Sequence, residues 1–229
     1  TDILIDAGSR ADSVDDIKKY IDKYCTDGKL EYVIATHGHQ DHIAALVGNT
    51  SKDNNGGRDG LLNQYKIGTL IYFANTNNGE SKLGKNFVSQ VNFLKQNGTT
   101  CLKADEAFNN SPKYDIAEGI SLNILYNKYY FEKSSDENNY SVVSMIKYGE
   151  HNFLFTGDLE KEGEEELASY YDKSTEAKTL PSHIDLFKGG HHGSKTSSNM
   201  CLLNLVNPKR CAVCCCAGST EYTVNRVNT

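Results

Sequence analysis

Apolar runs and amphipathic stretches alternate along the first hundred residues of the chain. Residues 2–6 predict a strand that ends in the glycine turn "AGS". Apolar residues recur with a helical period over 13–25, with Ser13 or Asp12 as the expected N-cap. Further strands are predicted at 30–36, at 68–74 and near Cys101, and further helices over 42–48 and 87–98. The stretch 48–60 is rich in Gly, Asn and Asp, which predicts an exposed loop.

The pattern changes in the second half of the chain, where several strand-like segments precede the return of helices. Residues 120–126, 140–149 and 151–158 predict strands, and "YGEHN" joins the last two as a hairpin. Helix, strand, helix and strand are then predicted in turn at 159–171, 184–190, 201–207 and 210–218. No internal repeat of fixed period occurs. The pattern therefore predicts mixed sheets covered by helices, in one layered α/β domain over residues 1–229.

The amino-acid composition limits the classes of protein to which the chain could belong. The chain has 229 residues, 38% hydrophobic and 24% charged, as is ordinary for a globular fold. Because the net charge is −6, binding to long duplex DNA is not indicated unless Arg58, Lys188 and Lys195 gather near the site. No run approaches the roughly 20 apolar residues of a membrane span, and no signal peptide is visible. The abrupt start on a core strand leads us to expect a piece of a longer chain.

Four of the seven cysteines crowd into "CAVCCCAG": Cys211, Cys214, Cys215 and Cys216. Neighbouring strand residues point to opposite faces, so these cysteines are not expected to pair with one another. They also lack the two separated CxxC halves of a structural zinc site. We expect a buried strand that uses Cys as a small hydrophobe. Such use favours a reducing compartment, the cytoplasm first, unless the chain is a domain of a larger membrane or secreted protein.

Histidines and acidic residues gather where predicted strands end. "THGHQDH" follows the apolar run "YVIA" and holds His37, His39, Asp41 and His42. In a tight turn the first two can converge on one ion while the last two turn toward a second. Imidazole nitrogen with carboxylate oxygen suits zinc, and also manganese or iron.

Two more clusters follow strands later in the chain. Asp158 in "FTGDLE" ends a strand, and Gly157 lets the backbone turn closely there. His191 and His192 in "FKGGHHGSK" lie between glycines at another strand end. Since α/β folds place their sites at strand ends, the three clusters together indicate metal binding.

The order of these motifs resembles that of the metallo-β-lactamase superfamily: His-x-His-x-Asp-His, then a strand-ending Gly-Asp, then a strand-ending His-Gly. "ILIDAGS" resembles the strand and turn before the first motif, with Asp6 at the supporting acidic position. "NNYSVVSMIKYGEHNFLFTGDLE" and "DLFKGGHHGSKTSS" resemble the soluble domain of ComEC-type DNA-uptake proteins and their stand-alone relatives. The phosphorylcholine esterases of Gram-positive bacteria are a second similar branch. The resemblance implies a four-layer αββα sandwich, here without terminal strands.

The resemblance also implies two divalent metals, zinc first and manganese as the alternative. It assigns the ligands of one metal as His37 and His39, those of the other as Asp41, His42 and His192, and the bridging ligand as Asp158. His191 is the alternative last ligand and is otherwise expected to face the substrate. Lys195 is expected to neutralise phosphate charge or to be solvated, and Ser194 and Thr196 to contact phosphate or cap a helix. The expected catalytic residues are Asp158, Asp41, His191 and Lys195.

The chain departs from the superfamily pattern in two ways. Most members have another histidine before Gly-Asp, but none occurs between His42 and His151, and His151 is expected at the surface of the hairpin. The corresponding region here reads "NNYS". Its Asn138, Asn139 and Ser141 are expected to line the site without replacing the missing histidine. The first metal would then have positions open to water or substrate. ComEC-type domains also commonly have Asp at the position of His39, and a later "GHP"-like segment that is absent here.

The leading hypothesis is a binuclear hydrolase that attacks a phosphodiester, in a small molecule or single-stranded nucleic acid, with a metal-bound hydroxide. The close rival is an esterase of the phosphorylcholine type, for which Tyr129, Tyr130 and Phe131 could supply an aromatic cage. Hydrolysis of lactams or thioesters is a different reaction class, and a metal-binding module with a decayed site is the non-enzymatic alternative. The 49–60 loop and the 127–139 stretch are expected to border the cleft. The sequence leaves the protein partners unknown.

Overall fold

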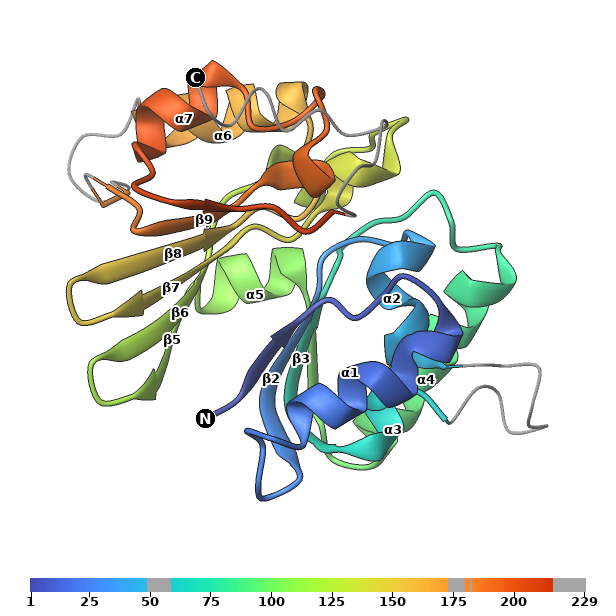
Figure 1. The fold of residues 1–229 in the computed structure, drawn as a ribbon. Helices are drawn as coiled ribbons and strands as arrows, with labels where there is room; N and C mark the ends of the chain where they lie inside the picture. Colours follow the sequence, from blue (N-terminus) through green and yellow to red (C-terminus); the bar gives the residue numbers. More distant parts are fainter. Residues whose placement is uncertain (49–58, 173–179, 182, 216–229) are drawn as a thin grey trace. The chain divides into compact units, whose positions relative to one another are not determined.

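The computed structural model describes residues 1–48, 59–172, 180–181 and 183–215 (Figure 1). The chain divides into two compact units, residues 1–106 and 107–229. Residues 49–58 of the loop predicted at 48–60, which include Arg58, lie outside the described residues, and so does Cys216. Within the described residues, no helix has the length and apolar character needed to cross a membrane.

The first unit is built on a parallel sheet with the strand order β1-β2-β3-β4. Its strands are β1 (Ile3–Ile5), β2 (Lys29–Ala35), β3 (Lys66–Tyr72) and β4 (Thr100–Lys103). Its helices are the 3-10 turn η1 (Ala11–Ser13), α1 (Val14–Ile21), α2 (Gln40–Val47), α3 (Leu61–Gln64) and α4 (Lys82–Gln96). Because all four strands run the same way, the segments that follow them leave from one edge of the sheet.

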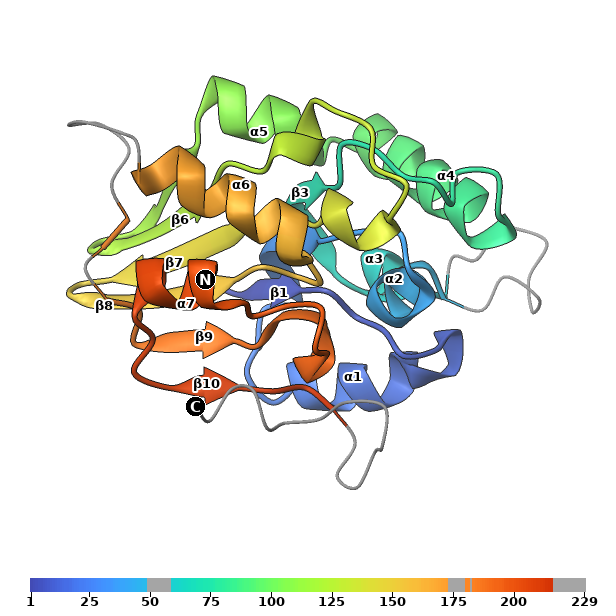
Figure 2. The same ribbon diagram turned by 90° about the horizontal axis from the view of Figure 1, so that it is seen from above.

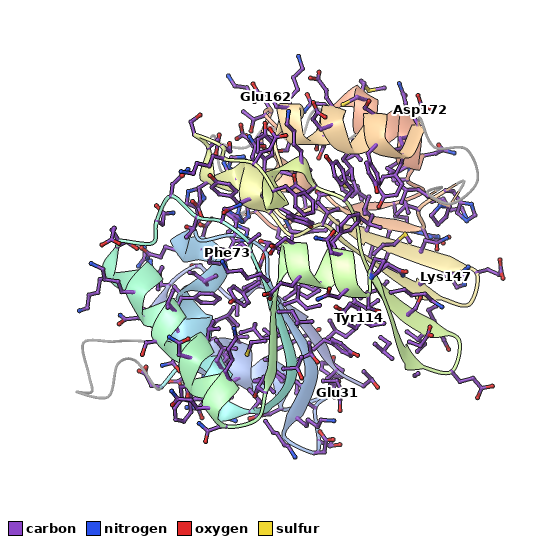
Figure 3. The ribbon with its side chains drawn as sticks, turned by 180° about the vertical axis from the view of Figure 1, so that it is seen from behind. Glu31, Phe73, Tyr114, Lys147, Glu162 and Asp172 are labelled. Atoms are coloured by element: carbon purple, nitrogen blue, oxygen red, sulfur yellow. The ribbon has the colours of Figure 1, made fainter. Side chains whose placement is uncertain are left out.

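One apolar core joins the helices of this unit to its sheet. Val33 of β2 and Leu70 of β3 are fully buried in it, together with Ile43 of α2 and Phe87 of α4. Phe73, labelled in Figure 3, stacks on Phe87 with ring centroids 5.1 Å apart. All four α-helices contribute to this one cluster, so they cover the same face of the sheet.

The second unit contains a mixed sheet with the order β10-β9-β8-β7-β6-β5. The pairs from β5 to β8 are antiparallel, whereas β8, β9 and β10 are parallel. The strands are β5 (Lys113–Ala117), β6 (Ile120–Ile124), β7 (Ser144–Tyr148), β8 (His151–Phe155), β9 (Leu186–Lys188) and β10 (Cys211–Ala212). The 3-10 turns are η2 (Lys128–Tyr130), η3 (Glu137–Tyr140) and η4 (Gly190–Gly193).

Helices α6 (Lys161–Asp172) and α7 (Met200–Val206) lie side by side on one face of this sheet (Figure 2). Leu167 of α6 and Leu202 of α7 are buried in one cluster with Leu154 of β8 and Phe187 of β9. Glu162 and Asp172 mark the two ends of α6 in Figure 3 and are exposed. A further helix, α5 (Ala104–Asn110), spans the boundary between the units.

The structure confirms the predicted α/β class, because two sheets with helices are the parts of the expected sandwich. It corrects several boundaries and adds α3, α5 and β5, whose short segments carry no clear period. Ser13 is the N-cap residue of α1, as predicted, but its side chain makes no capping hydrogen bond, because η1 runs directly into the helix. Helix α4 begins before the predicted range, since Ser81 Oγ accepts a hydrogen bond from Gly84 N at 3.0 Å. The single domain stays a prediction.

The cysteine-rich segment is not the buried strand that the sequence predicts. Only Cys211 and Ala212 form β10, which pairs with β9 alone among the described residues. Cys214 is exposed, and Cys211 and Cys215 are half-buried. A strand at the edge of a sheet holds the backbone on one side only, so the chain can leave the sheet after Ala212.

A substitution at Gly163 of α6 would test how tightly this unit is packed. Alanine is the better helix former by about 1 kcal/mol, but a Cβ at this position would overlap the fully buried side chain of Leu159. We expect Gly163→Ala to lower the free energy of unfolding by about 1–3 kcal/mol, because the overlap outweighs the gain in propensity. Urea unfolding measures this change.

Glu165→Ala is the matched control, since the Glu165 side chain on the same helix is 53% exposed. Its effect should stay within about 0.5 kcal/mol. A Gly163→Ala protein more stable than the parent would contradict the packing described for α6.

Candidate metal centre

The first histidine cluster follows β2 and leads into α2. His37 and His42 are buried, whereas the Asp41 side chain is 48% exposed. His37 Nε2 lies 3.0 Å from His39 Nδ1, and His42 Nε2 lies 3.7 Å from Asp41 Oδ2. Two ligands about 2.1 Å from a tetrahedral ion lie about 3.4 Å apart. Each pair therefore has the spacing of two ligands that share one ion.

Asp6, directly after β1, fixes this cluster from behind. Its Oδ1 accepts a hydrogen bond from Thr36 N at 2.7 Å, and its Oδ2 accepts one from Thr36 Oγ1 at 2.7 Å. The same Oδ2 lies 2.7 Å from His42 Nδ1. Since a carboxylate only accepts, His42 carries its proton on Nδ1, and Nε2 is the nitrogen that a metal would take.

The glycine turn after β1 lies against the backbone of the same cluster. Ala7 N donates to His42 O at 2.8 Å, and Ala45 N donates to Ala7 O at 3.0 Å. A Cβ at Gly8 would overlap the carbonyl oxygen of Asp41. This close approach explains why "AGS" precedes the histidine motif and why the turn needs a residue without a side chain.

In the second unit, Asp158 lies in a tight turn after β8. Gly157 has φ 57°, a left-handed conformation that favours glycine. Asp158 N donates to Ser141 Oγ at 2.9 Å, and Glu160 N donates to Asn139 Oδ1 at 3.2 Å. The "NNYS" segment thus holds the backbone on both sides of the Asp158 carboxylate.

His191 and His192 face Asp158 from η4. Their Nε2 atoms lie 4.0 Å and 3.4 Å, respectively, from Asp158 Oδ2, and the Asp158 side chain is only 2% exposed. His192 Nδ1 lies 2.9 Å from the carbonyl oxygen of Cys214, which holds its ring in the same way that Asp6 holds His42. His192 is therefore the nearer of the two histidines to Asp158, with its Nε2 turned to the carboxylate.

The ring of His191 is held from the other side. Its Nδ1 lies 3.0 Å from Thr196 Oγ1 and 3.2 Å from Glu160 Oε1. Burial raises the pKa of Glu160, and the neighbouring Asp136 carboxylate raises it further. Thr196 therefore contacts a histidine and does not cap α7, whose N-cap position is Asn199.

Lys195 is exposed beside this turn, and Ser194 Oγ lies 3.0 Å from Thr196 Oγ1. A hydrophilic cavity of about 510 Å³ opens here. It is lined by Ser134, Ser135, Asp136, Asn139, Glu160, Lys161, Glu162, Lys195, Thr196 and Asn199. The cavity wall therefore includes the last part of the 127–139 stretch.

Two other predictions concern residues of the second unit. His151 is the first residue of β8, and its Nδ1 lies 3.6 Å from Asp185 Oδ1. Its side chain is 65% exposed, which confirms the predicted surface position. Tyr129 and Tyr130 are buried, with 8% and 3% exposure, and only Phe131 of this group is exposed. Tyr130 Oη accepts a hydrogen bond from Val143 N at 2.8 Å. The two tyrosines therefore belong to the core and do not form an open aromatic cage.

Sequence reasoning missed two residues that hold the candidate site. Asn127 Nδ2 donates to Asn139 O at 2.8 Å and to Ser141 O at 2.9 Å, which fixes "NNYS". Glu164 of α6 accepts hydrogen bonds from the segment after His192. Helical spacing could have identified Glu164, because it lies three positions before the buried Leu167. Asn127 has no comparable signal in a single sequence.

Comparisons with known proteins agree with the motif order. Residues 1–53 match the family model of the metallo-beta-lactamase superfamily. The chain is similar to ComE operon protein 3 of Bacillus subtilis, with 26% identity over 79% of this chain and 19% of that protein. It is similar to competence protein ComA of Neisseria gonorrhoeae, with 38% identity over 34% of this chain and 10% of that protein. Recombination protein 2 of Haemophilus influenzae is 36% identical over 31% of this chain and 8% of its own length.

The chain thus spans about a fifth or less of the length of these relatives. The family match covers β1, the glycine turn and the whole first histidine motif, which are the parts that Asp6 and Gly8 join. The longest of the similarities extends over most of the chain. These comparisons support a relationship of this chain to the metallo-beta-lactamase superfamily and to ComEC-type competence proteins.

Proposed function

We propose that the chain is a phosphodiesterase that depends on two divalent metals. The match of residues 1–53 to the superfamily model supports a metal-dependent hydrolase in general terms. The metals would be held by His37 with His39, by Asp41, His42 and His192, and by Asp158 as the shared ligand. That union of donors from both units rests on the motif order of the superfamily. The donor geometry inside each unit supports metal binding by that unit's own residues.

The observation that carries the proposal is the Asp6–His42 hydrogen bond of 2.7 Å. A histidine whose Nδ1 is held by a carboxylate or carbonyl presents Nε2 as a metal ligand. His192 repeats the arrangement with the carbonyl of Cys214. The donors are nitrogen and oxygen atoms, without thiolate, so zinc and manganese both fit.

Two metals held by these residues would lower the pKa of a bound water molecule toward neutrality and would polarise a phosphoryl oxygen. The chain's own residues would orient the substrate. Thr196 and Glu160 hold Nδ1 of His191, so Nε2 faces the side of Asp158 where the reacting group would lie. The exposed Lys195 would neutralise phosphate charge next to that histidine.

A phosphodiester is favoured over an acyl substrate for two reasons. The chain lacks the middle histidine, and the "NNYS" segment in its place supports the Asp158 turn instead of supplying a ligand. Two of the relatives carry competence or recombination in their names, which fits a nucleic-acid substrate. With a net charge of −6, we propose single-stranded nucleic acid or a small phosphodiester as the substrate class.

The first test is metal content together with hydrolysis of bis-p-nitrophenyl phosphate in added zinc or manganese. We expect about two metals per chain. Asp158→Ala should lower turnover by about 100-fold or more, because it removes the proposed shared ligand. His151→Ala is the matched control and should keep the parental rate, since His151 is exposed at the start of β8.

One tightly held metal without phosphodiester turnover would overturn this mechanism. Lactam and thioester substrates would then be assayed with the same preparation. Parental turnover in Asp158→Ala would equally remove Asp158 from the proposed site.

Asp6→Asn tests the support of the first cluster. An asparagine has one acceptor oxygen, so it cannot accept from Thr36 N at one terminal atom and from Thr36 Oγ1 and His42 Nδ1 at the other. We expect the metal dissociation constant to rise about tenfold or more, as measured by titration with zinc and a competing chelator. Asp16→Asn is the control, because the Asp16 side chain is 84% exposed. Equal affinities in Asp6→Asn and the parent would show that His42 needs no such support.

A further inference from the structure

Glu164 is the one member of an acidic run that turns inward. The first half of α6 reads "KEGEEE", and Glu162, Glu165 and Glu166 in this run are exposed. Glu164, by contrast, is 0% exposed. A buried carboxylate is costly unless hydrogen-bond donors or a cation compensate it, so the contacts of Glu164 need an explanation.

Both carboxylate oxygens of Glu164 receive hydrogen bonds from the segment that follows the histidines. Ser198 N donates to Oε1 at 2.6 Å. Asn199 donates to Oε2 twice, from its backbone N and from Nδ2, each at 2.8 Å. Hydrogen bonds to an ionised acceptor are about twice as strong as neutral ones. Glu164 therefore ties the backbone at 198–199 to the first turns of α6.

The restraint continues from Ser198 to the histidines. Ser198 Oγ accepts a hydrogen bond from Gly190 N at 3.0 Å, and Gly190 directly precedes His191. The chain of hydrogen bonds thus runs from Glu164 through Ser198 to the start of η4. From Gly190 the restraint passes along the backbone to His191 and His192, without a contact to either imidazole.

The histidine loop needs such a restraint because its backbone is strained. His191 and His192 have φ of 46° and 53°, and Ser198 has φ of 59°. Left-handed conformations cost residues with a side chain roughly 1–2 kcal/mol each. Strain of this kind persists only where the surrounding structure holds it, and it concentrates at functional sites.

We propose that Glu164 is a positioning residue that holds the 190–199 segment in its strained conformation and so sets His192 and His191 for metal and substrate. The role of His192 as a ligand rests on the proposed function. Glu164 itself touches neither metal nor substrate. Glutamine cannot replace it fully, because its amide nitrogen would face N–H donors of Asn199 or Ser198.

The ionisation of Glu164 determines the pH at which the proposal should be tested. Burial raises the pKa of Glu164 to about 7, although the hydrogen bonds from Asn199 and Ser198 act in the opposite direction. The charge of Glu160 raises the pKa of Glu164 further. Burial raises the pKa of the Cys201 thiol on α7, and the charge of Glu164 in turn raises the pKa of that thiol further. At pH 8 the carboxylate is mostly ionised, so measurements at this pH compare the charged acceptor with its neutral replacement.

The experiment compares Glu164→Gln with the parent in the full chain at pH 8. In metal-free protein, hydrogen exchange of the amides of Gly190 and Ser198 should become about tenfold faster or more. Titration with Mn²⁺ or Zn²⁺ should show a dissociation constant raised about tenfold. Glu165→Gln, the exposed neighbour on the same helix, should leave both quantities unchanged.

Ser198→Ala is the second variant and removes only the link to Gly190. It should speed the exchange of Gly190 and weaken metal binding in the same direction, by a smaller factor. If Glu164→Gln does not fold, this variant decides the question. Its expected result supports the proposal, and unchanged exchange and affinity overturn it.

The outcomes separate this inference from the proposed function. A folded Glu164→Gln protein with parental metal affinity and parental exchange at 190–199 would overturn the positioning role, even if its melting temperature fell. A parent that binds no metal would instead defeat the proposed function. Hydrogen exchange would then still decide whether Glu164 holds the histidine segment.

Discussion

The Asp6 carboxylate accepts hydrogen bonds from Thr36 and His42, and the first histidine cluster depends on them. Asp6 follows β1, and Thr36 follows the neighbouring parallel strand β2, so the register Ile5–Ile34 brings the two residues together. His42 joins them from α2 at 2.7 Å. Without this acceptor, the buried Nδ1–H of His42 would lose its hydrogen bond at a cost of about 1–3 kcal/mol. The sheet, the glycine turn and the histidines therefore depend on one another for their positions.

In the second unit, neutral groups hold the candidate metal-binding residues in place. Ser141 Oγ and Asn139 Oδ1 accept the backbone N–H groups around Asp158, and the carbonyl of Cys214 holds the ring of His192. These partners leave the Asp158 carboxylate and the Nε2 atom of His192 as the groups turned toward each other. Side chains held in this way would lose little conformational freedom on binding an ion, which is how rigid metal sites gain affinity.

Much of the fold could be predicted because its strands and helices have clear periods. The apolar runs before Asp6, Thr36 and Asp158 were sufficient to locate β1, β2 and β8. Short elements such as α3 and β5 were missed, since a few residues cannot establish a period. The segment at Cys211–Cys215 was predicted wrongly because its small apolar side chains resemble those of a core strand. Whether such a strand is central or at an edge depends on residues far away in the chain.

The sequence by itself determined which side chains could carry metal chemistry, because imidazole and carboxylate groups crowd at strand ends in a recognisable order. It could not assign the residues that hold them. Asn139 and Ser141 support a backbone turn, Glu164 restrains the histidine segment, and the Cys214 carbonyl orients a ring. Each of these contacts joins residues at least 17 positions apart, and the Asn139–Glu160 contact joins residues 21 apart. Only the tertiary structure decides such partners, since a buried polar group takes whichever donor or acceptor the fold brings beside it.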